Sequence, residues 1–178
     1  MVIHQIHDLT DTYVRDLLIN GLSKIDKSSP YCKNYHPDYQ HIEGNLFYVL
    51  DNGRYNKGKY FILEDNSTYI SSAGWNEYEL DTSIALILTR MYTDTSHRMN
   101  YHISKYILPL ILEEVKDYEY IWGTTNPYNK KIYDWFVRVS QGKSGSLDES
   151  WPEIYKKFKP IGIRNIYYTD QYVLEYQK

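Results

Sequence analysis

The segment Ser83–Met91 constrains the fold more than any other part of the chain. It reads Ser-Ile-Ala-Leu-Ile-Leu-Thr-Arg-Met, and its apolar residues stand side by side instead of alternating with polar ones. A strand that is apolar on both faces is covered on both sides and lies inside a sheet. We therefore expect a central strand here.

A helix and a further strand are predicted directly after this central strand. The helix spans Tyr101–Lys116 and the strand Tyr118–Thr124. Pro109 lies inside the helix and removes one backbone donor, so we expect a bend there. One helical face is apolar, through Ile103, Ile107, Leu110, Ile111 and Val115. Together these elements form a local βαβ unit.

The rest of the chain adds mostly strands. Val14, Leu17 and Leu18 predict a helix over Asp11–Asn20, which Gly21 would end. Strands are expected at Leu46–Leu50, Lys59–Leu63, Thr68–Trp75, Ile161–Tyr168 and Gln171–Tyr176, with a helical turn within Trp151–Phe158. The expected fold class is α/β (α+β), with a mixed, mostly antiparallel sheet of about six or seven strands flanked by helices.

The composition of the chain excludes several classes of protein. The 178 residues suit a single domain, 1–178. A net charge of −3 argues against reliance on phosphate attraction, and so against a nucleic-acid partner. One cysteine, Cys32, cannot build a disulfide framework or a zinc cluster. No apolar run reaches the roughly 18 residues of a membrane span, and no signal peptide is visible. We expect a soluble, cytoplasmic protein.

Tyrosine is unusually frequent, with 21 residues against 4 phenylalanines. Tyrosine has an apolar body and a polar tip. It therefore either fills half-buried positions of the fold or forms a stacking surface for a ligand. The composition leaves both interpretations open.

The first candidate site is the polar stretch Tyr92–Asn100, between the central strand and the following helix. A loop that enters a helix presents free backbone N–H groups and the positive end of the helix dipole, which favour an anion such as a pyrophosphate. Arg90, His97 and Arg98 add cationic donors. An ordinary βα connection with solvated charges explains the same pattern.

The second candidate site begins with Asn126-Pro127, a helix start with a capping residue. Tyr133 follows Asn126 by seven residues, after the strand that closes the βαβ unit. This spacing and the order of elements over roughly residues 8–176 resemble the GNAT N-acetyltransferase superfamily. The composition also resembles that of uncharacterised GNAT-like proteins encoded by phages, which implies a host cytoplasm.

The resemblance implies a function as an acyl-CoA-dependent N-acyltransferase that moves an acetyl group from acetyl-CoA to an unidentified amine. Backbone groups around Leu88, Thr89 and Arg90 would pair with the pantetheine arm, and Asn126 or Asn129 would contact it. Tyr133 would protonate the departing CoA thiolate. The pyrophosphate would lie on the backbone N–H groups of His97, Arg98, Met99, Asn100 and Tyr101.

The chain departs from the family pattern in this loop, where Arg/Gln-x-x-Gly-x-Gly/Ala is usual. A register that starts at His97 puts Asn100 and His102 at the glycine positions, and one that starts at Arg98 puts Tyr101 and Ile103 there. Asn tolerates a left-handed backbone better than most residues, which favours the first register. The central strand carries no carboxylate to serve as a base.

Other functions remain open from the sequence. The fold could serve as a catalytically inactive interaction module, such as a phage protein that contacts a host protein. Tyrosine stacking with Lys and Arg would suit a nucleic acid, which the net charge opposes. No metal site is expected, since His97 and His102 are five residues apart and not four. The acceptor amine, which can be a small molecule or a protein, stays unassigned.

Overall fold

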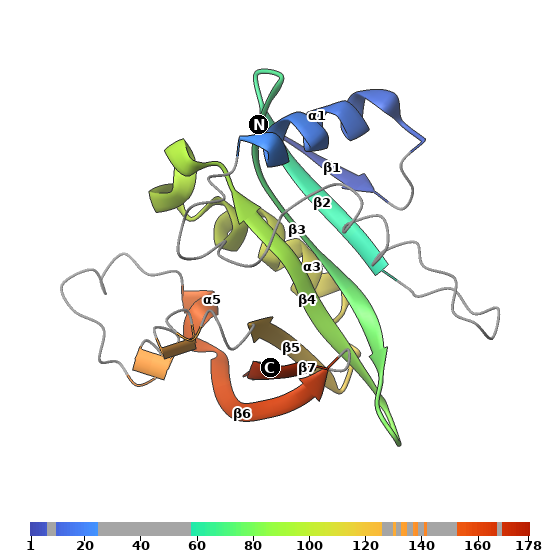
Figure 1. Ribbon diagram of the computed structural model, residues 1–178, viewed down its shortest axis with the longest axis vertical. Helices are drawn as coiled ribbons and strands as arrows, with labels where there is room; N and C mark the ends of the chain where they lie inside the picture. The colour runs from blue at the N-terminus through green and yellow to red at the C-terminus, as the bar shows by residue number, and fades with distance from the viewer. Residues whose placement is uncertain are drawn as a thin grey trace.

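The computed structural model describes residues 1–6, 10–24, 58–125, 130, 133–134, 137–138, 141, 153–166 and 169–178, and Figure 1 shows their arrangement. The elements in chain order are β1 (Val2–Ile6), α1 (Thr12–Ser23), β2 (Gly58–Asp65), β3 (Thr68–Glu79), β4 (Ile84–Thr93), the 3-10 helix η1 (Thr95–Asn100), the π-helix η2 (Ile103–Ile107), α3 (Leu108–Glu114), β5 (Tyr120–Thr125), α5 (Glu153–Lys156), β6 (Phe158–Ile166) and β7 (Thr169–Tyr176).

The strands form one seven-stranded sheet in the order β1-β2-β3-β4-β5-β7-β6. Neighbouring strands are antiparallel except β4 and β5, which are parallel. The helical segment η2–α3 connects this parallel pair, as expected for a βαβ unit. The predicted fold class, a mixed and mostly antiparallel sheet flanked by helices, is therefore confirmed.

Both faces of the sheet are covered, and strand β2 shows how. Phe61 and Leu63 belong to the apolar cluster that includes the buried residues of η2 and α3. Tyr60 and Ile62 belong to the cluster that includes the buried residues of α1. Because successive side chains of a strand point to opposite faces, α1 and α3 lie on opposite sides of the sheet, as Figure 1 shows.

Strand β4 is central, as predicted from its apolar run. Ala85, Leu86, Ile87 and Leu88 are each buried, with no more than 4% of their surface exposed. Even residues pack toward α3, and odd residues pack with Trp122 and Val173 on the other face. The strand extends to Thr93, two residues past its expected end.

Helix α1 differs from the prediction at its C-terminal end. Asp11 caps its start by accepting hydrogen bonds from the N–H groups of Tyr13 and Val14, but Gly21 lies inside the helix. A Cβ atom at Gly21 would stand 2.1 Å from Cγ of Tyr69. Glycine is therefore present because the buried Tyr69 ring packs against the helix backbone, and not because the helix ends there.

The expected helix Tyr101–Lys116 is two helices joined end to end. The π-helix η2 ends where the Leu108 N–H bonds to the carbonyl of Ile103, five residues earlier. Pro109 follows as the second residue of α3. In a continuous α-helix its ring would clash with the Lys105 carbonyl and its missing N–H would leave that carbonyl unpaired. The wider turn before Pro109 accommodates both effects.

Other boundaries also shift. Val2–Ile6 forms an edge strand, β1, that the sequence analysis did not predict. The expected loop Tyr92–Asn100 consists of the end of β4 and the 3-10 helix η1. The predicted strand Leu46–Leu50 lies outside the described residues. The helical turn near the C-terminus is confirmed as α5, and the two closing strands as β6 and β7.

Gly21→Ala tests the packing of α1 on the sheet. The new methyl group overlaps the buried ring of Tyr69, so we expect a loss of about 1–3 kcal/mol in the free energy of unfolding. Asn20→Ala, at an exposed position of the same helix, serves as the control and should leave stability within about 0.5 kcal/mol of the wild type. Urea denaturation measures both. Equal stability of the two variants would contradict the packing described here.

Candidate functional site

The parallel strands β4 and β5 pair over only part of their length. Their pairing runs from Ala85–Tyr120 to Leu88–Gly123. Beyond these pairs β4 continues to Thr93, while β5 continues to Thr125 in contact with β7. From Thr89 onward, the edge of β4 that faces away from β3 therefore lacks a strand partner in the described sheet. Its backbone N–H and C=O groups need partners of another kind.

An irregularity in the β3–β4 pairing lies at the same place. Thr89 pairs with Gly74, whereas Tyr92 pairs with Ser72, so β4 has one extra residue between these pairs. A bulge of this kind bends the strand and increases its twist. The irregularity follows directly after the last β4–β5 pair, so the two features fall in the same stretch of β4.

The segment after β4 is built around Asp94. Its carboxylate accepts hydrogen bonds from the Ser96 side chain and, at 2.9 Å, from the Ser96 N–H. Its carbonyl accepts the His97 N–H at 2.9 Å. Partial burial acts to raise the Asp94 pKa, but the two bonds from Ser96 and the charges of His97 and Lys24 outweigh it and lower the pKa below its usual value.

A left-handed residue separates η1 from the next helix. Tyr101 has φ 53° and ψ 35°, a conformation that costs a bulky residue about 1–2 kcal/mol and that glycine adopts freely. Position 101 is the glycine position of the register that starts at Arg98. The register favoured from the sequence, with Asn100 at that position, does not match the left-handed residue.

A further set of backbone amide groups follows Tyr101. The first α-helical bond runs from the Lys105 N–H to the Tyr101 carbonyl at 3.0 Å. The N–H groups of His102, Ile103 and Ser104 precede that bond, and such groups are the unpaired donors of a helix N-terminus. The His97 N–H already donates to Asp94. Of the N–H groups predicted to hold the pyrophosphate, that of His97 is therefore engaged within the protein.

Tyr155 of α5 also reaches this helix start, and the sequence analysis gave it no role. Its side chain hydrogen-bonds to that of Ser104, and burial raises its pKa. Ser104 is 3% exposed, and its hydroxyl donates to the Tyr101 carbonyl at 2.9 Å. No sequence signal connects residues 104 and 155, because only the fold brings α5 to this place.

Tyr133 packs near the end of β5. Its ring stacks on that of Tyr172, with 4.5 Å between ring centroids and 26° between planes. Tyr172 belongs to β7 and pairs with Thr125, the last residue of β5. The ring of Tyr133 is half-buried and packs against the cluster that includes α3. The partners predicted with it, Asn126 and Asn129, lie outside the described residues.

The carboxylates nearest in sequence to β4 lie toward its first residue. Glu77 pairs with Leu86, within the stretch of β4 that pairs with β5, and Glu79 pairs with Ile84, just before that stretch, so neither is at Thr89. The Glu77 carboxylate also accepts a hydrogen bond from Tyr118. The described residues therefore supply no carboxylate of this group where β4 and β5 part.

His102 is a half-buried base beside the segment. Its two ring nitrogens are covered and have no hydrogen-bond partner among the described residues, and the ring stacks on Tyr106 and meets His97 edge to face at 5.6 Å. Desolvation lowers the His102 pKa, and the positive charges of His97 and Lys105 lower it further. The protonated form of His102 is therefore disfavoured in the folded protein.

Two further properties concern the described parts of the chain. No three His, Cys, Asp or Glu side chains come together there as a metal site would require. None of the helices there is both long enough and apolar enough to cross a bilayer.

Comparisons with known proteins identify the fold. No family model and no curated protein sequence matches the chain. Solved structures do match. An acyl-CoA N-acyltransferase from Pseudomonas aeruginosa has 7% identity and a TM-score of 0.56, covering 98% of both chains. An aminoglycoside 6'-N-acetyltransferase complexed with coenzyme A has 15% identity and a TM-score of 0.57, covering 98% of this chain and 96% of its own.

The third match is an Arabidopsis thaliana protein in complex with the bisubstrate analogue CoA-Ac-MVNAL, with 11% identity, a TM-score of 0.51 and full coverage of both chains. The chain has the GNAT acetyltransferase fold. In this GNAT-like fold, β4 and β5 are the parallel pair, and the helix formed by η2 and α3 connects them.

His102→Phe tests the half-buried ring, whose covered nitrogens have no hydrogen-bond partner among the described residues. The pKa of His102 is lowered in the folded state from 6.5, so the unfolded chain takes up the proton first as pH falls. This group costs nothing above pH 6.5 and reduces stability as pH falls below it. We expect the Phe variant to lose less melting temperature than the wild type between pH 7.5 and pH 5.5, as measured by calorimetry.

His4→Phe is the matched control. The His4 ring hydrogen-bonds to Glu64 at 2.5 Å, and His4→Phe removes this bond. His4→Phe should therefore melt at a lower temperature than the wild type at pH 7.5, whereas His102→Phe should match the wild type at that pH. A His102→Phe variant that follows the wild-type pH profile would show that the half-buried ring is not the source of the acid sensitivity.

Proposed function

We propose that the chain is an acyl-CoA-dependent N-acyltransferase that transfers an acetyl group from acetyl-CoA to an amine. The observation that carries the proposal is the end of the β4–β5 pairing at Leu88–Gly123, which leaves one edge of β4 without a strand partner. The GNAT-like fold supports it, since structures of this fold were solved with coenzyme A and with a CoA bisubstrate analogue.

Backbone groups carry the proposed binding of the co-substrate. The pantetheine arm bears amide groups, and the edge of β4 at Leu88, Thr89 and Arg90 would pair with them as a further strand would. The pyrophosphate would lie on the N-terminal amides before Lys105, with Tyr101 in the left-handed position that shapes the loop. Asn126 and Asn129 remain candidates for contacts with the pantetheine arm.

The reaction requires one bond to form and one to break. The neutral amine attacks the thioester carbonyl, a C–N bond forms, and the C–S bond breaks to release the CoA thiolate. The Tyr133 hydroxyl would donate the proton that the thiolate takes up, and solvent would take the proton that the amine loses. Backbone N–H groups of β4 would stabilise the negative charge on the carbonyl oxygen in the transition state.

The acceptor remains an amine of unassigned identity. One matching structure is named for aminoglycosides, and another was solved with an analogue that contains a peptide sequence. A small amine and a protein amine are therefore both compatible with the fold. Nothing in the described residues favours one of these two acceptors over the other.

Turnover of Tyr133→Phe tests the proposed function. Release of CoA thiol from acetyl-CoA is measured with aminoglycosides, peptides with free N-termini and polyamines as acceptors, and calorimetry measures acetyl-CoA affinity. We expect turnover to fall by about 100-fold or more if the phenol is the acid, with acetyl-CoA affinity within about threefold of the wild type.

Tyr172→Phe is the matched control, because it removes a hydroxyl from the ring on which Tyr133 stacks. It should retain wild-type turnover. Equal turnover of both variants would remove Tyr133 from the mechanism. A wild-type protein that shows no saturable binding of acetyl-CoA would contradict the function and leave an interaction module with this fold.

A further inference from the structure

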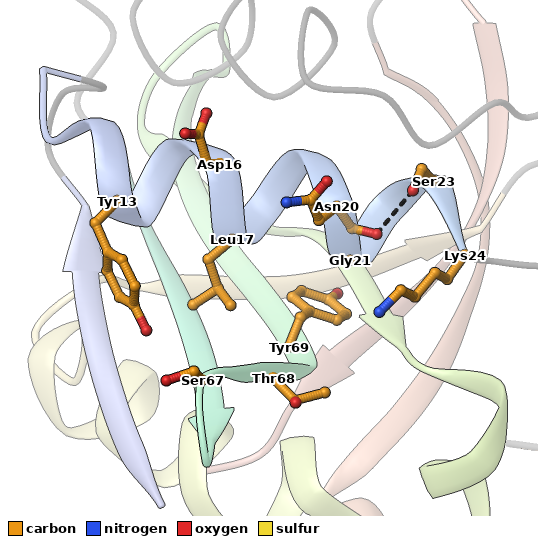
Figure 2. A pocket seen from close by; sticks show the side chains of 10 residues that line it. All are labelled: Tyr13, Asp16, Leu17, Asn20, Gly21, Ser23, Lys24, Ser67, Thr68 and Tyr69. Atoms are coloured by element: carbon orange, nitrogen blue, oxygen red, sulfur yellow. Dashed lines mark hydrogen bonds between the residues drawn. The ribbon is translucent and has the colours of Figure 1, made fainter.

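A cavity lies between α1 and the start of β3 and has a volume of about 380 Å³. Figure 2 shows its lining side chains, which include Tyr13, Leu17, Lys24, Ser67, Thr68 and Tyr69. Tyr69 precedes Trp75, the β3 partner of Leu88, by six residues. The cavity is thus about 20 Å along β3 from the last β4–β5 pair. It lies beside the end of β4, where the Asp94 N–H donates to the Ile70 carbonyl at 2.9 Å.

The floor of the cavity is apolar and held in place. Leu17 and Tyr69 are 7% and 4% exposed, and Tyr69 packs against the backbone at Gly21. The Tyr69 hydroxyl is engaged below the floor, where it bonds to the Ser72 hydroxyl at 2.6 Å. The Tyr69 hydroxyl is therefore engaged within the protein, and only a small part of the side chain reaches the cavity.

Both ends of the cavity wall are fixed as well. Tyr13 donates its hydroxyl to Glu64 at 2.7 Å, which joins α1 to β2. Asn66 and Ser67 have φ values of 48° and 58°, as in a tight two-residue hairpin turn. The turn places Ser67 and Thr68 on the wall opposite α1.

Lys24 supplies the charge at the C-terminal end of α1. In Figure 2 its ammonium group points toward Tyr69, whereas the carboxylate of Asp16 points away from Tyr69. No described carboxylate forms an ion pair with Lys24, although its charge contributes to the low pKa of Asp94. The lining of the cavity therefore includes one cation, Lys24, and one carboxylate, Asp16, beside an apolar floor.

We propose that this cavity binds a small monocarboxylate with an apolar body. The carboxylate would pair with Lys24, the body would lie on Leu17 and Tyr69, and Ser67 and Thr68 would supply hydroxyl groups. The volume falls at the lower end of the range for small-molecule sites. A doubly charged phosphate fits less well, because it would meet one cation with Asp94 nearby.

Calorimetric titration of the full chain with 3-phenylpropanoate tests the proposal, without acetyl-CoA, so that its outcome is independent of the acyltransferase activity. We expect saturable binding at millimolar or lower concentration. The neutral analogue 3-phenylpropanamide should bind at least tenfold more weakly. Inorganic phosphate is the third probe and should show no saturable binding.

Lys24→Met should weaken binding of 3-phenylpropanoate at least tenfold, and Lys24→Arg should retain it. Lys24 is exposed, and melting temperatures check that both variants fold. Lys116→Met removes a lysine next to α3, on the opposite face of the sheet, and is the matched control; it should bind as the wild type does.

Four results would overturn the proposal. They are the absence of saturable binding by the wild type, equal binding of the amide, binding that persists in Lys24→Met, and a preference for phosphate. The last would identify a general anion site in place of a carboxylate site.

Discussion

The short parallel pairing of β4 and β5 determines how the rest of this molecule is arranged. A parallel pair needs a crossover connection, which here is η2 and α3, and that connection covers one face of the sheet. The pairing ends after Leu88–Gly123, although β5 continues beside β7 to Thr125, and the second half of β4 keeps β3 alone. The unpaired edge and the helix start that follows are consequences of one strand arrangement.

Much of this arrangement was predictable from the sequence because it depends on local patterns. The consecutive apolar residues of β4 indicate burial on both faces, and the 3.6-residue periodicity after Tyr101 indicates the crossover helix. Strand β1 was missed because it is a short edge strand, and its pairing with β2 joins residues about sixty positions apart. Gly21 was misinterpreted because its role depends on Tyr69, which is distant in sequence.

The candidate site, like the fold, has features that the sequence predicts and features that arise only from tertiary packing. Tyr133 and the segment after β4 were identified from the spacing of the GNAT family, which is a property of the sequence. The left-handed residue at position 101, the contact of Tyr155 with Ser104 and the cavity beneath α1 arise from tertiary packing. No pattern of residue types along the chain encodes them, since each joins segments that meet only after folding.

Amide hydrogen exchange along β4, with and without acetyl-CoA, tests the central claim most directly. If the co-substrate pairs with the edge that β5 leaves, exchange should slow at residues 89–93 and at the amides that follow Tyr101. Exchange at residues 85–88 should stay unchanged because these residues already pair on both sides. Uniform protection of β4 in the free protein, or no change at residues 89–93 at saturating acetyl-CoA, would contradict the account.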